Sequence, residues 1–335
     1  MTISGSINLI AAQEVLPPVG KIDVGSAICA VAFTANGEYL ISGGDGAQVW
    51  RLKDGQQMTN TNTAMDCLAV SKDGRWIAVE TDWDGAIVWD AETYKQVFAH
   101  KGNSHTTYGV DFSPDSTRLI VASRQSYNTS IVTVWDLALG KWVQTLCHEG
   151  LLRAAKYSPL GDRIATATRY SVRVWDSNNG RLLLAIPVTP TAFGNAGVIW
   201  FDNHLLVVSR NKIKQIEAST GSTVSEWAVP DGDCTSCIAL SRYGEFIAYS
   251  ATRTVTFWDT STHTQLGLIQ HPQDIRSIAL SPDDRFLAIG GEDNKIVIES
   301  LSFISVSTMC SLIGPYLNNN FCVPFSLRIG FDYFP

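Results

Sequence analysis

Short apolar runs alternate with polar turns along most of the chain. One stretch shows the pattern clearly, with apolar runs at 154–157, 163–167, 172–175 and 182–186 separated by residues rich in Ser, Gly, Asp and Asn. Runs of this length, rich in branched and small residues, are typical of β-strands and too short for helices. Where apolar residues are consecutive, as in 77–79 and 287–289, we expect inner strands that are covered on both faces.

The same group of four strands recurs with a period near forty residues. Each unit ends in Trp-Asp or a replacement, and the successive endings are 39, 46, 40, 41, 42 and 41 residues apart, at Trp50, Trp89, Trp135, Trp175, Ile216, Trp258 and Glu299. The turn between the first two strands marks the same period independently, at 35–37, 72–74, 114–116, 159–161, 202–204, 242–244 and 282–284. Pro, Asn, Asp and Gly in these turns suit tight reversals. Both markers indicate seven units.

These repeats resemble the WD-repeat family, in which each repeat of about 40 to 45 residues forms one four-stranded blade. The best copies are 106–136, which contains VDFSPDS and VTVWD, and 148–176, which contains a Ser-Pro turn and VWD. The resemblance covers residues 20–301 and implies an all-β fold, a seven-bladed β-propeller of four-stranded antiparallel blades. We therefore predict an N-terminal extension at 1–14, a propeller at 15–301 and an atypical hydrophobic tail at 302–335.

In many repeats of this family a buried network of His, Ser or Thr, Asp and Trp links the strands of a blade, and in this chain the network is incomplete. His148, Thr166 and Trp175 fit this network in the fourth unit, and His271 and Asp293 fit it in the seventh. A ring must also close, because open end blades would expose unpaired strand edges. Residues 20–24 are the expected closing strand, by analogy with the Gly-Lys opening at 140–143. The competing donor is 303–308, which follows the seventh unit directly.

Composition and charge narrow the class of protein. The 26 glycines, ten tryptophans and 17% charged residues match a sheet-rich globular chain. A net charge of −7 argues against bulk binding to nucleic acid or to an anionic membrane. No apolar window reaches the length of a membrane helix, and the N-terminus lacks the basic region of an export signal. The seven scattered cysteines lack the spacing of a disulfide scaffold. We expect a monomeric protein of the cytoplasm, with the nucleus as the alternative.

The sequence offers little support for catalysis, metals or cofactors. Cys234 and Cys237 form the one CxxC pair, without the further ligands that zinc requires, and Cys237 falls at an inner-strand position equivalent to Ala30. Phosphate loops, nucleophile elbows and zincin motifs do not occur. Gly-rich residues 43–46 lie in a turn between strands and precede no helix. We expect a protein that is not an enzyme and has no cofactor or metal.

One face of the predicted ring collects arginines. Loops that join the second and third strands, and loops that enter the first strand, should share one face, which we call the arginine face. Its expected partner-binding residues are Arg124, Arg153, Arg169, Arg210, Arg253, Arg276, Tyr108 and Tyr170. Guanidinium groups on a concave rim suit carboxylates and phosphates. The alternative is that these arginines are ordinary turn residues paired with nearby acids such as Glu292.

The opposite face, which we call the turn face, should carry Arg75, Arg118, Arg163 and Arg285, and for these solubility is a sufficient role. The WD-repeat resemblance implies a scaffold that binds partner proteins, here acidic or phosphorylated peptides on the arginine face. The alternative is a substrate receptor or sensor in a larger complex, such as a ubiquitin-ligase or signalling assembly. A propeller enzyme is the weakest reading, because the sequence lacks carboxylate clusters and metal ligands at suitable spacing.

Overall fold

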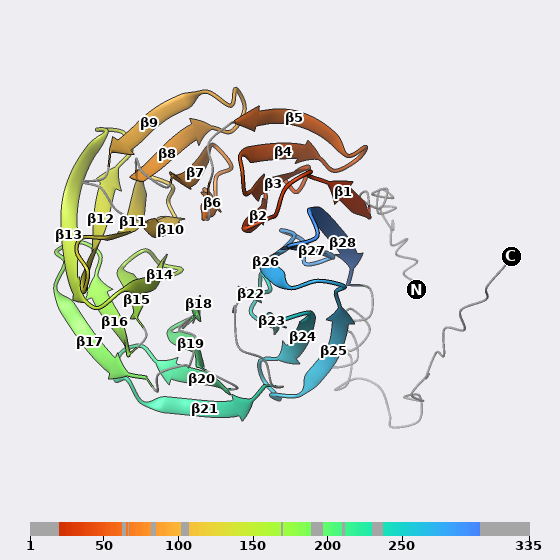
Figure 1. Cartoon of the computed structure of the whole chain (residues 1–335). Coiled ribbons are helices and arrows are strands. Elements are labelled where there is room, and N and C mark those ends of the chain that lie inside the picture. The colour runs from red at the N-terminus through yellow and green to blue at the C-terminus, as the bar shows by residue number, and fades with distance from the viewer. Residues whose placement is uncertain are drawn as a thin grey trace, which may run out of the picture. The chain divides into compact units, whose positions relative to one another are not determined.

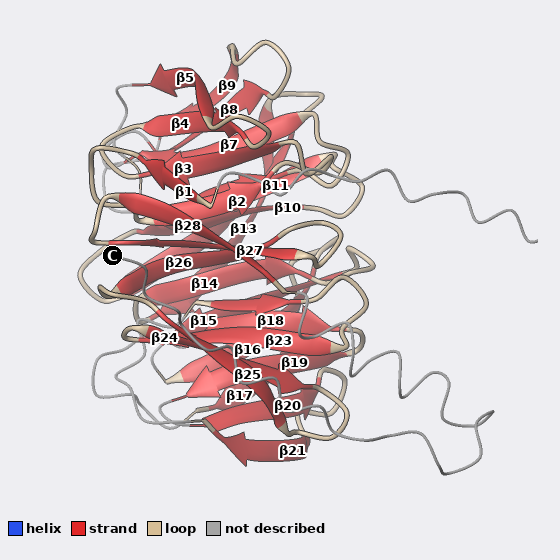
Figure 2. Cartoon of the chain, turned by 90° about the vertical axis from the view of Figure 1, so that its right-hand side faces the viewer, coloured by secondary structure: helices blue, strands red, loops and turns tan. Residues whose placement is uncertain are grey.

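The computed structural model describes residues 20–61, 65, 67–81, 85–101, 107–168, 170–188, 197–209, 212–229 and 237–301. Every regular element in these ranges is a strand, and Figure 2 shows this from the side. None of the described residues forms a helix long and apolar enough to cross a membrane. The predicted extension at 1–14 and tail at 302–335 lie outside the described residues, so those domain boundaries stay a prediction.

The first three blades use strands in chain order. Blade 1 contains β2 (Ala30–Phe33), β3 (Tyr39–Gly43), β4 (Ala47–Arg51) and β5 (Gln56–Thr61). Blade 2 contains β6 (Leu68–Val70), β7 (Trp76–Thr81), β8 (Gly85–Asp90) and β9 (Gln96–Lys101). Blade 3 contains β10 (Thr107–Phe112), β11 (Arg118–Arg124), β12 (Thr129–Asp136) and β13 (Lys141–Glu149).

The next three blades repeat the plan. Blade 4 contains β14 (Leu152–Tyr157), β15 (Arg163–Thr168), β16 (Ser171–Asp176) and β17 (Leu182–Pro187). Blade 5 contains β18 (Gly197–Phe201), β19 (His204–Ser209), β20 (Lys212–Glu217) and β21 (Thr223–Ala228). Blade 6 contains β22 (Ile238–Leu240), β23 (Phe246–Ala251), β24 (Thr254–Asp259) and β25 (Gln265–Gln270).

Blade 7 is assembled from both ends of the repeat region. Its inner strands are β26 (Ile275–Leu280), β27 (Phe286–Gly291) and β28 (Lys295–Ser300), and its outer strand is β1 (Lys21–Asp23). β1 pairs antiparallel with β28, with Ile22 opposite Ile296. This confirms the predicted closing strand, whereas the competing donor at 303–308 lies outside the described residues. Ile22 is 4% exposed and joins a hydrophobic cluster shared by blades 7 and 1.

The seven sheets form a ring, which confirms the predicted all-β, seven-bladed propeller of four-stranded antiparallel blades (Figure 1). In each sheet the first strand lies nearest the centre and the last lies at the rim. The second and third strands are mostly buried, and the hydrophobic clusters join residues of neighbouring blades. Stability therefore comes from packing between blades as well as from the hydrogen-bonded sheets.

The turn between the first and second strands contains a residue of positive φ in all seven blades, although the turn of blade 5 is a tight two-residue reversal in which Phe201 pairs with His204. One residue in each turn has a positive φ between 52° and 75°, at Gly37, Gly74, Ser116, Gly161, Asp202, Gly244 and Asp284. Gly adopts this conformation without steric cost, and Asp tolerates it. Before most of these turns, a Ser or Thr hydroxyl accepts a hydrogen bond from the first backbone N–H of the second strand. Ser158 Oγ, for example, accepts from Arg163 N at 3.0 Å. The turn sequences predicted from the repeat therefore fix where each blade reverses.

The Trp position near the end of each unit coincides with an irregularity in the sheet. The pairing of the third and fourth strands shifts register at this position in six blades, for example between Val174 and Trp175. In blade 5, Ile216 takes the Trp place at 1% exposure, so the blade forms without the Trp-Asp pair. A side chain of either type fills the space between two blades.

The buried polar network is only partly the one that the family resemblance implies. Trp175 Nε1 donates to Thr166 Oγ1 at 2.9 Å, as expected. His148 meets the Trp175 ring edge-on at 4.9 Å, but its two ring nitrogens have no hydrogen-bond partner among the described residues. In blade 7, His271 Nε2 lies 3.7 Å from Asp293 Oδ2, which supports the predicted pair.

Candidate functional site

The loops of the arginine face are tied together by backbone hydrogen bonds. The loop between the second and third strands of one blade bonds the segment that enters the next blade: Gly150 N donates to Asn128 O at 2.8 Å, and Val188 N donates to Tyr170 O at 2.9 Å. At the boundary between blades 6 and 7, Ile275 N donates to Thr252 O at 2.7 Å. The two sets of loops therefore share one face of the ring, as the repeat register required.

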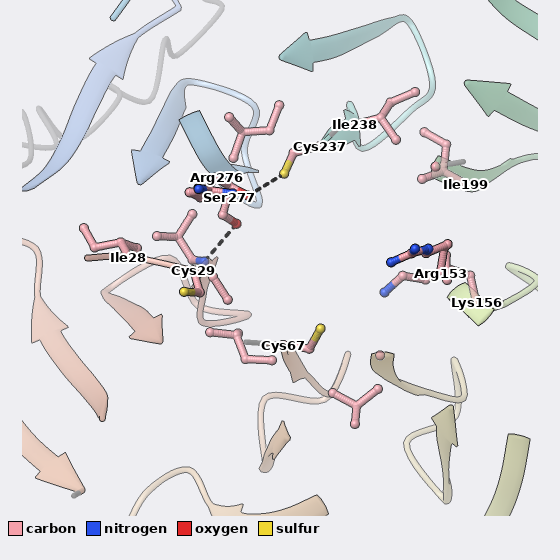
Figure 3. A pocket seen from close by; sticks show the side chains of 18 of the residues that line it. Ile28, Cys29, Cys67, Arg153, Lys156, Ile199, Cys237, Ile238, Arg276 and Ser277 are labelled. Carbon is pink, nitrogen blue, oxygen red and sulfur yellow. Dashed lines mark hydrogen bonds between the residues drawn. The ribbon is translucent and has the colours of Figure 1, made fainter. Parts of the chain in front are cut away.

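A cavity of about 740 Å³ occupies the centre of the ring and is lined by the first strand of every blade (Figure 3). Its described charged residues are three cations, Arg153, Lys156 and Arg276, and one acid, Glu292. Arg153 and Lys156 reach in from β14, and Arg276 lies on the other side of the cavity, on β26. The other lining residues are mainly small or apolar, so the cavity has the size and the mixed lining of a ligand site.

Lys156 is paired within the channel. Its Nζ lies 2.9 Å from Asp111 Oδ1, and Asp111 Oδ2 accepts the backbone N–H of Tyr157 at 2.9 Å. Burial opposes the charged ammonium, but the charge and hydrogen bond of Asp111 outweigh burial and raise the pKa of Lys156. The pair therefore stays ionised and links blade 3 to blade 4 beside the cavity.

Two of the predicted arginines have acidic partners on the same face. Arg276 donates through Nη2 and Nε to Glu292, and this hydrogen bond raises the pKa of Arg276. Arg253 Nε donates to Asp274 Oδ1 at 2.9 Å. These side chains are about half exposed, and ion pairs of that kind contribute little to stability.

Arg124 and two tyrosines supply further contacts on the face. Arg124 Nε donates to Ser126 O at 3.0 Å, and its guanidinium lies 5.5 Å from the centre of the Tyr127 ring. Tyr127 is 88% exposed and Tyr170 is 59% exposed. Exposed aromatic rings beside guanidinium groups are typical anchor points for protein partners.

The remaining predicted residues are only partly placed. Arg169 and Arg210 lie outside the described residues. Tyr108 belongs to β10, but its side chain is outside the described part. The residues that the structure brings together around one cavity are therefore Arg153 and Arg276, with Arg124, Arg253 and Tyr170 on the surrounding loops.

The thiol of Cys237 is not activated as a nucleophile, and Cys147 does not pair with His148. Cys237 lines the cavity, its thiol donates to Arg276 O at 2.8 Å, and burial raises its pKa to about 11. A raised pKa keeps the thiol protonated and unreactive. Cys234 lies outside the described ranges. Cys147 is exposed and His148 is buried, so they lie on opposite sides of β13 and form no dyad.

The sequence prediction missed two features of this site. One is the Asp111–Lys156 pair, although both residues hold the same first-strand place in adjacent repeats, where Ala69 and Ile199 stand in neighbouring blades. The other is Asp274 as the partner of Arg253, which comes from the segment entering the next blade. Within the described ranges, no group of three or more His, Cys, Asp and Glu side chains could hold a metal ion.

Comparisons with known proteins find one matching family and several relatives of low sequence identity. The sequence profile of the family described as WD domain, G-beta repeat matches residues 18–47 and 262–298, on the two sides of the ring closure. Eukaryotic translation initiation factor 3 subunit I of Caenorhabditis briggsae is 19% identical over 63% of this chain and 68% of its own length. Protein groucho of Drosophila melanogaster is 23% identical over 84% of this chain and 40% of its own length. The serine-threonine kinase receptor-associated protein of Gallus gallus is 22% identical over 59% of this chain and 54% of its own length.

Proposed function

The chain is a divergent member of the WD-repeat family, and from this premise we propose that it is a non-catalytic scaffold that binds an acidic or phosphorylated segment of a partner protein on its arginine face. WD-repeat propellers of this kind are typically interaction scaffolds in complexes. One relative is named as a factor subunit and another as receptor-associated. These names describe the relatives, and they make a role within a protein complex the natural one for this chain.

The observation that carries the proposal is the convergence of Arg153, Lys156 and Arg276 on one cavity. Guanidinium groups offer forked donors that match carboxylate and phosphate oxygens. The apolar walls lower the local dielectric, which strengthens the attraction of an anion that enters. The exposed rings of Tyr127 and Tyr170 add contact area around the entrance.

The pairs Arg253–Asp274 and Arg276–Glu292 fit a site that an anion opens by competition. The resident acids keep the guanidinium groups positioned when no partner is bound. A phosphate brings more charge than one carboxylate, so it can displace a half-exposed acid. Partner chemistry richer in negative charge is therefore expected to bind more tightly. A substrate receptor or sensor in a larger complex remains the alternative, and it differs in what the bound partner does next.

The test is a charge reversal on the arginine face. We expect the triple variant R124E/R153E/R276E to lose a coherent set of partners in affinity purification with quantitative mass spectrometry. The turn between β16 and β17, which holds Arg181, also lies on the turn face. The matched control R75E/R181E/R285E makes the same charge change on that face and is expected to keep those partners. Circular dichroism checks that both variants fold. An unchanged partner set in the first variant would refute the proposal.

A further inference from the structure

The boundary between blades 3 and 4 departs from the packing at other boundaries. At three other boundaries, the residue that begins the second strand of one blade shares a hydrophobic cluster with the residue that ends the first strand of the next blade. These pairs are Tyr39 with Val70, Trp76 with Phe112, and Phe286 with Phe33. At blades 3 and 4 the corresponding residues are Arg118 and Tyr157. At the next two boundaries only one residue of the pair is polar, Arg163 or His204, because the first strands of blades 5 and 6 end in Phe201 and Leu240. At blades 3 and 4 both residues carry a polar group.

A cavity of about 330 Å³ lies at this boundary on the turn face. Blade 3 contributes Arg118 and Asp115 to its lining, and blade 4 contributes Tyr157, Asp162, Asn178 and Leu160. The volume falls at the lower end of ligand pockets and suits one side chain of a peptide. Leu160 stands at its edge with 81% of its surface exposed.

The Tyr157 hydroxyl is the unusual group of this cavity. Tyr157 is 7% exposed, and its hydroxyl has no hydrogen-bond partner among the described residues. Burial raises the pKa of Tyr157, so the hydroxyl stays protonated and can both donate and accept. Buried hydroxyl groups are nearly always paired, because an unpaired one destabilises the fold. A polar group from outside the chain would supply the missing partner.

Arg118 and the two acids complete the donor and acceptor set. Arg118 Nη1 donates to Ser177 O at 3.3 Å, which holds the guanidinium across the boundary. Asp115 Oδ1 already accepts from Ser113 Oγ at 2.6 Å and from Thr117 Oγ1 at 2.9 Å. Asp162 likewise accepts from Ser158 Oγ at 2.8 Å within its own turn. Asp162 Oδ2 also lies 3.6 Å from Arg163 Nε, so both acids of the cavity already have partners within the chain.

The charges select the class of ligand. The lining holds one guanidinium and two carboxylates, so an incoming carboxylate or phosphate meets repulsion. A neutral carboxamide avoids this, because its oxygen accepts from Arg118 and Tyr157 while its N–H2 donates toward Asp115 or Asn178. A purely apolar side chain would leave the Tyr157 hydroxyl unpaired.

We propose that this cavity between blades 3 and 4 binds the side-chain amide of an Asn or Gln in an extended peptide of a partner protein. An apolar neighbour of that residue packs on Leu160. The site is separate from the arginine face, and it gives Arg118 a role in recognition where the sequence suggested solubility alone.

Fluorescence polarisation with labelled hexapeptides tests the proposal on the full chain. The central residue of the peptide is Gln, Asn, Glu or Leu, and a leucine precedes it. We expect the Gln or Asn peptide to bind at least about ten-fold more tightly than both others, since one buried hydrogen-bonded group commonly gives such a factor. Preferential binding of the Glu peptide, equal binding of all four, or no binding overturns the assignment.

Variants separate recognition from stability. We expect Tyr157→Phe to weaken the amide peptide about ten-fold and to melt no lower than the wild type, because it removes an unpaired buried hydroxyl. Tyr39→Phe removes a hydroxyl at another boundary and should leave binding unchanged. The arginine-face variant R124E/R153E/R276E should also bind the amide peptide normally, which keeps this test independent of the proposed function. Unchanged binding by Tyr157→Phe, or an equal loss with Tyr39→Phe, contradicts the proposal.

Discussion

At the scale of single residues, several buried polar groups of this propeller are held without full hydrogen bonding. His148 is 3% exposed, and its ring nitrogens have no partner among the described residues. Burial, with a smaller contribution from the charge of Arg173, lowers its pKa to about 4. The imidazole is therefore uncharged in the folded protein near pH 7. A proton that the unfolded chain has bound to this ring must be released when the chain folds.

This predicts that the free energy of unfolding depends on pH through the titration of His148. The unfolded chain binds a proton near pH 6.5 and the folded chain only near pH 4, so stability falls as the pH drops through that window. We expect the wild type to lose about 2 kcal/mol from this group between pH 7.5 and 5. Between the same two pH values, the variant His148→Leu should lose about 2 kcal/mol less free energy of unfolding than the wild type. Urea unfolding at both pH values measures this difference. Equal losses in both proteins would refute the assignment.

At the scale of the element, the third strand of a blade has two ways to satisfy its Trp. In blade 4, Trp175 donates to Thr166 on the second strand, and in blade 1 Trp50 donates to Ser42 in the same manner. In blades 3 and 6 the acceptor is a Thr two residues earlier on the strand itself, Thr133 for Trp135 and Thr256 for Trp258. The Trp is repeated, but the group that holds its indole N–H differs between blades.

The two arrangements should be interchangeable within one blade. Thr166→Val leaves the buried Trp175 indole unpaired and is expected to destabilise the protein by about 1 to 3 kcal/mol. Arg173 stands two residues before Trp175, so Thr166→Val/Arg173→Thr places a hydroxyl where blades 3 and 6 have one. We expect the double variant to recover part of the loss in urea unfolding. If the double variant were less stable than Thr166→Val, the interchange would be wrong.

The repeat explains what could be predicted from the sequence and what could not. Turns such as 159–161 and endings such as Trp175 recur in chain order, so the strands, the blade count and the closure by 20–24 follow from local pattern. The acid that pairs with Arg253 comes from the segment that enters the next blade, and the hydroxyl of Tyr157 has no partner among the described residues because of its neighbours in space. Such facts depend on the exact approach of two blades, which a period does not encode.

At the scale of the whole molecule, seven similar blades make a ring in which one blade is assembled differently from the rest. Six blades are continuous in the chain, whereas blade 7 joins β1 to β28. The closing contact is small: three residue pairs, with Ile22 as its buried side chain between exposed Lys21 and Asp23. The integrity of the ring therefore depends on a short strand.

Replacing Ile22 should weaken the ring at that point. Ile22→Ala is expected to destabilise the protein by about 2 to 5 kcal/mol, the usual effect of truncating a buried aliphatic side chain. The control Lys21→Ala changes an exposed neighbour in the same strand and should shift stability by less than about 0.5 kcal/mol. Thermal and urea unfolding measure both, and similar losses in the two variants would contradict the role of Ile22.

Closure by β1 also sets an order of events during synthesis. Ile22 leaves the ribosome 274 residues before its partner Ile296, which at about 5 to 20 residues per second is roughly 15 to 55 seconds. Over that interval the first strand of the nascent ring has no sheet to join. A strand of three residues with a lysine and an aspartate at its ends is a poor template for wrong pairing. The brevity of β1 is therefore expected to protect the growing chain during the wait, and β1 can complete blade 7 only after Ile296 has been made.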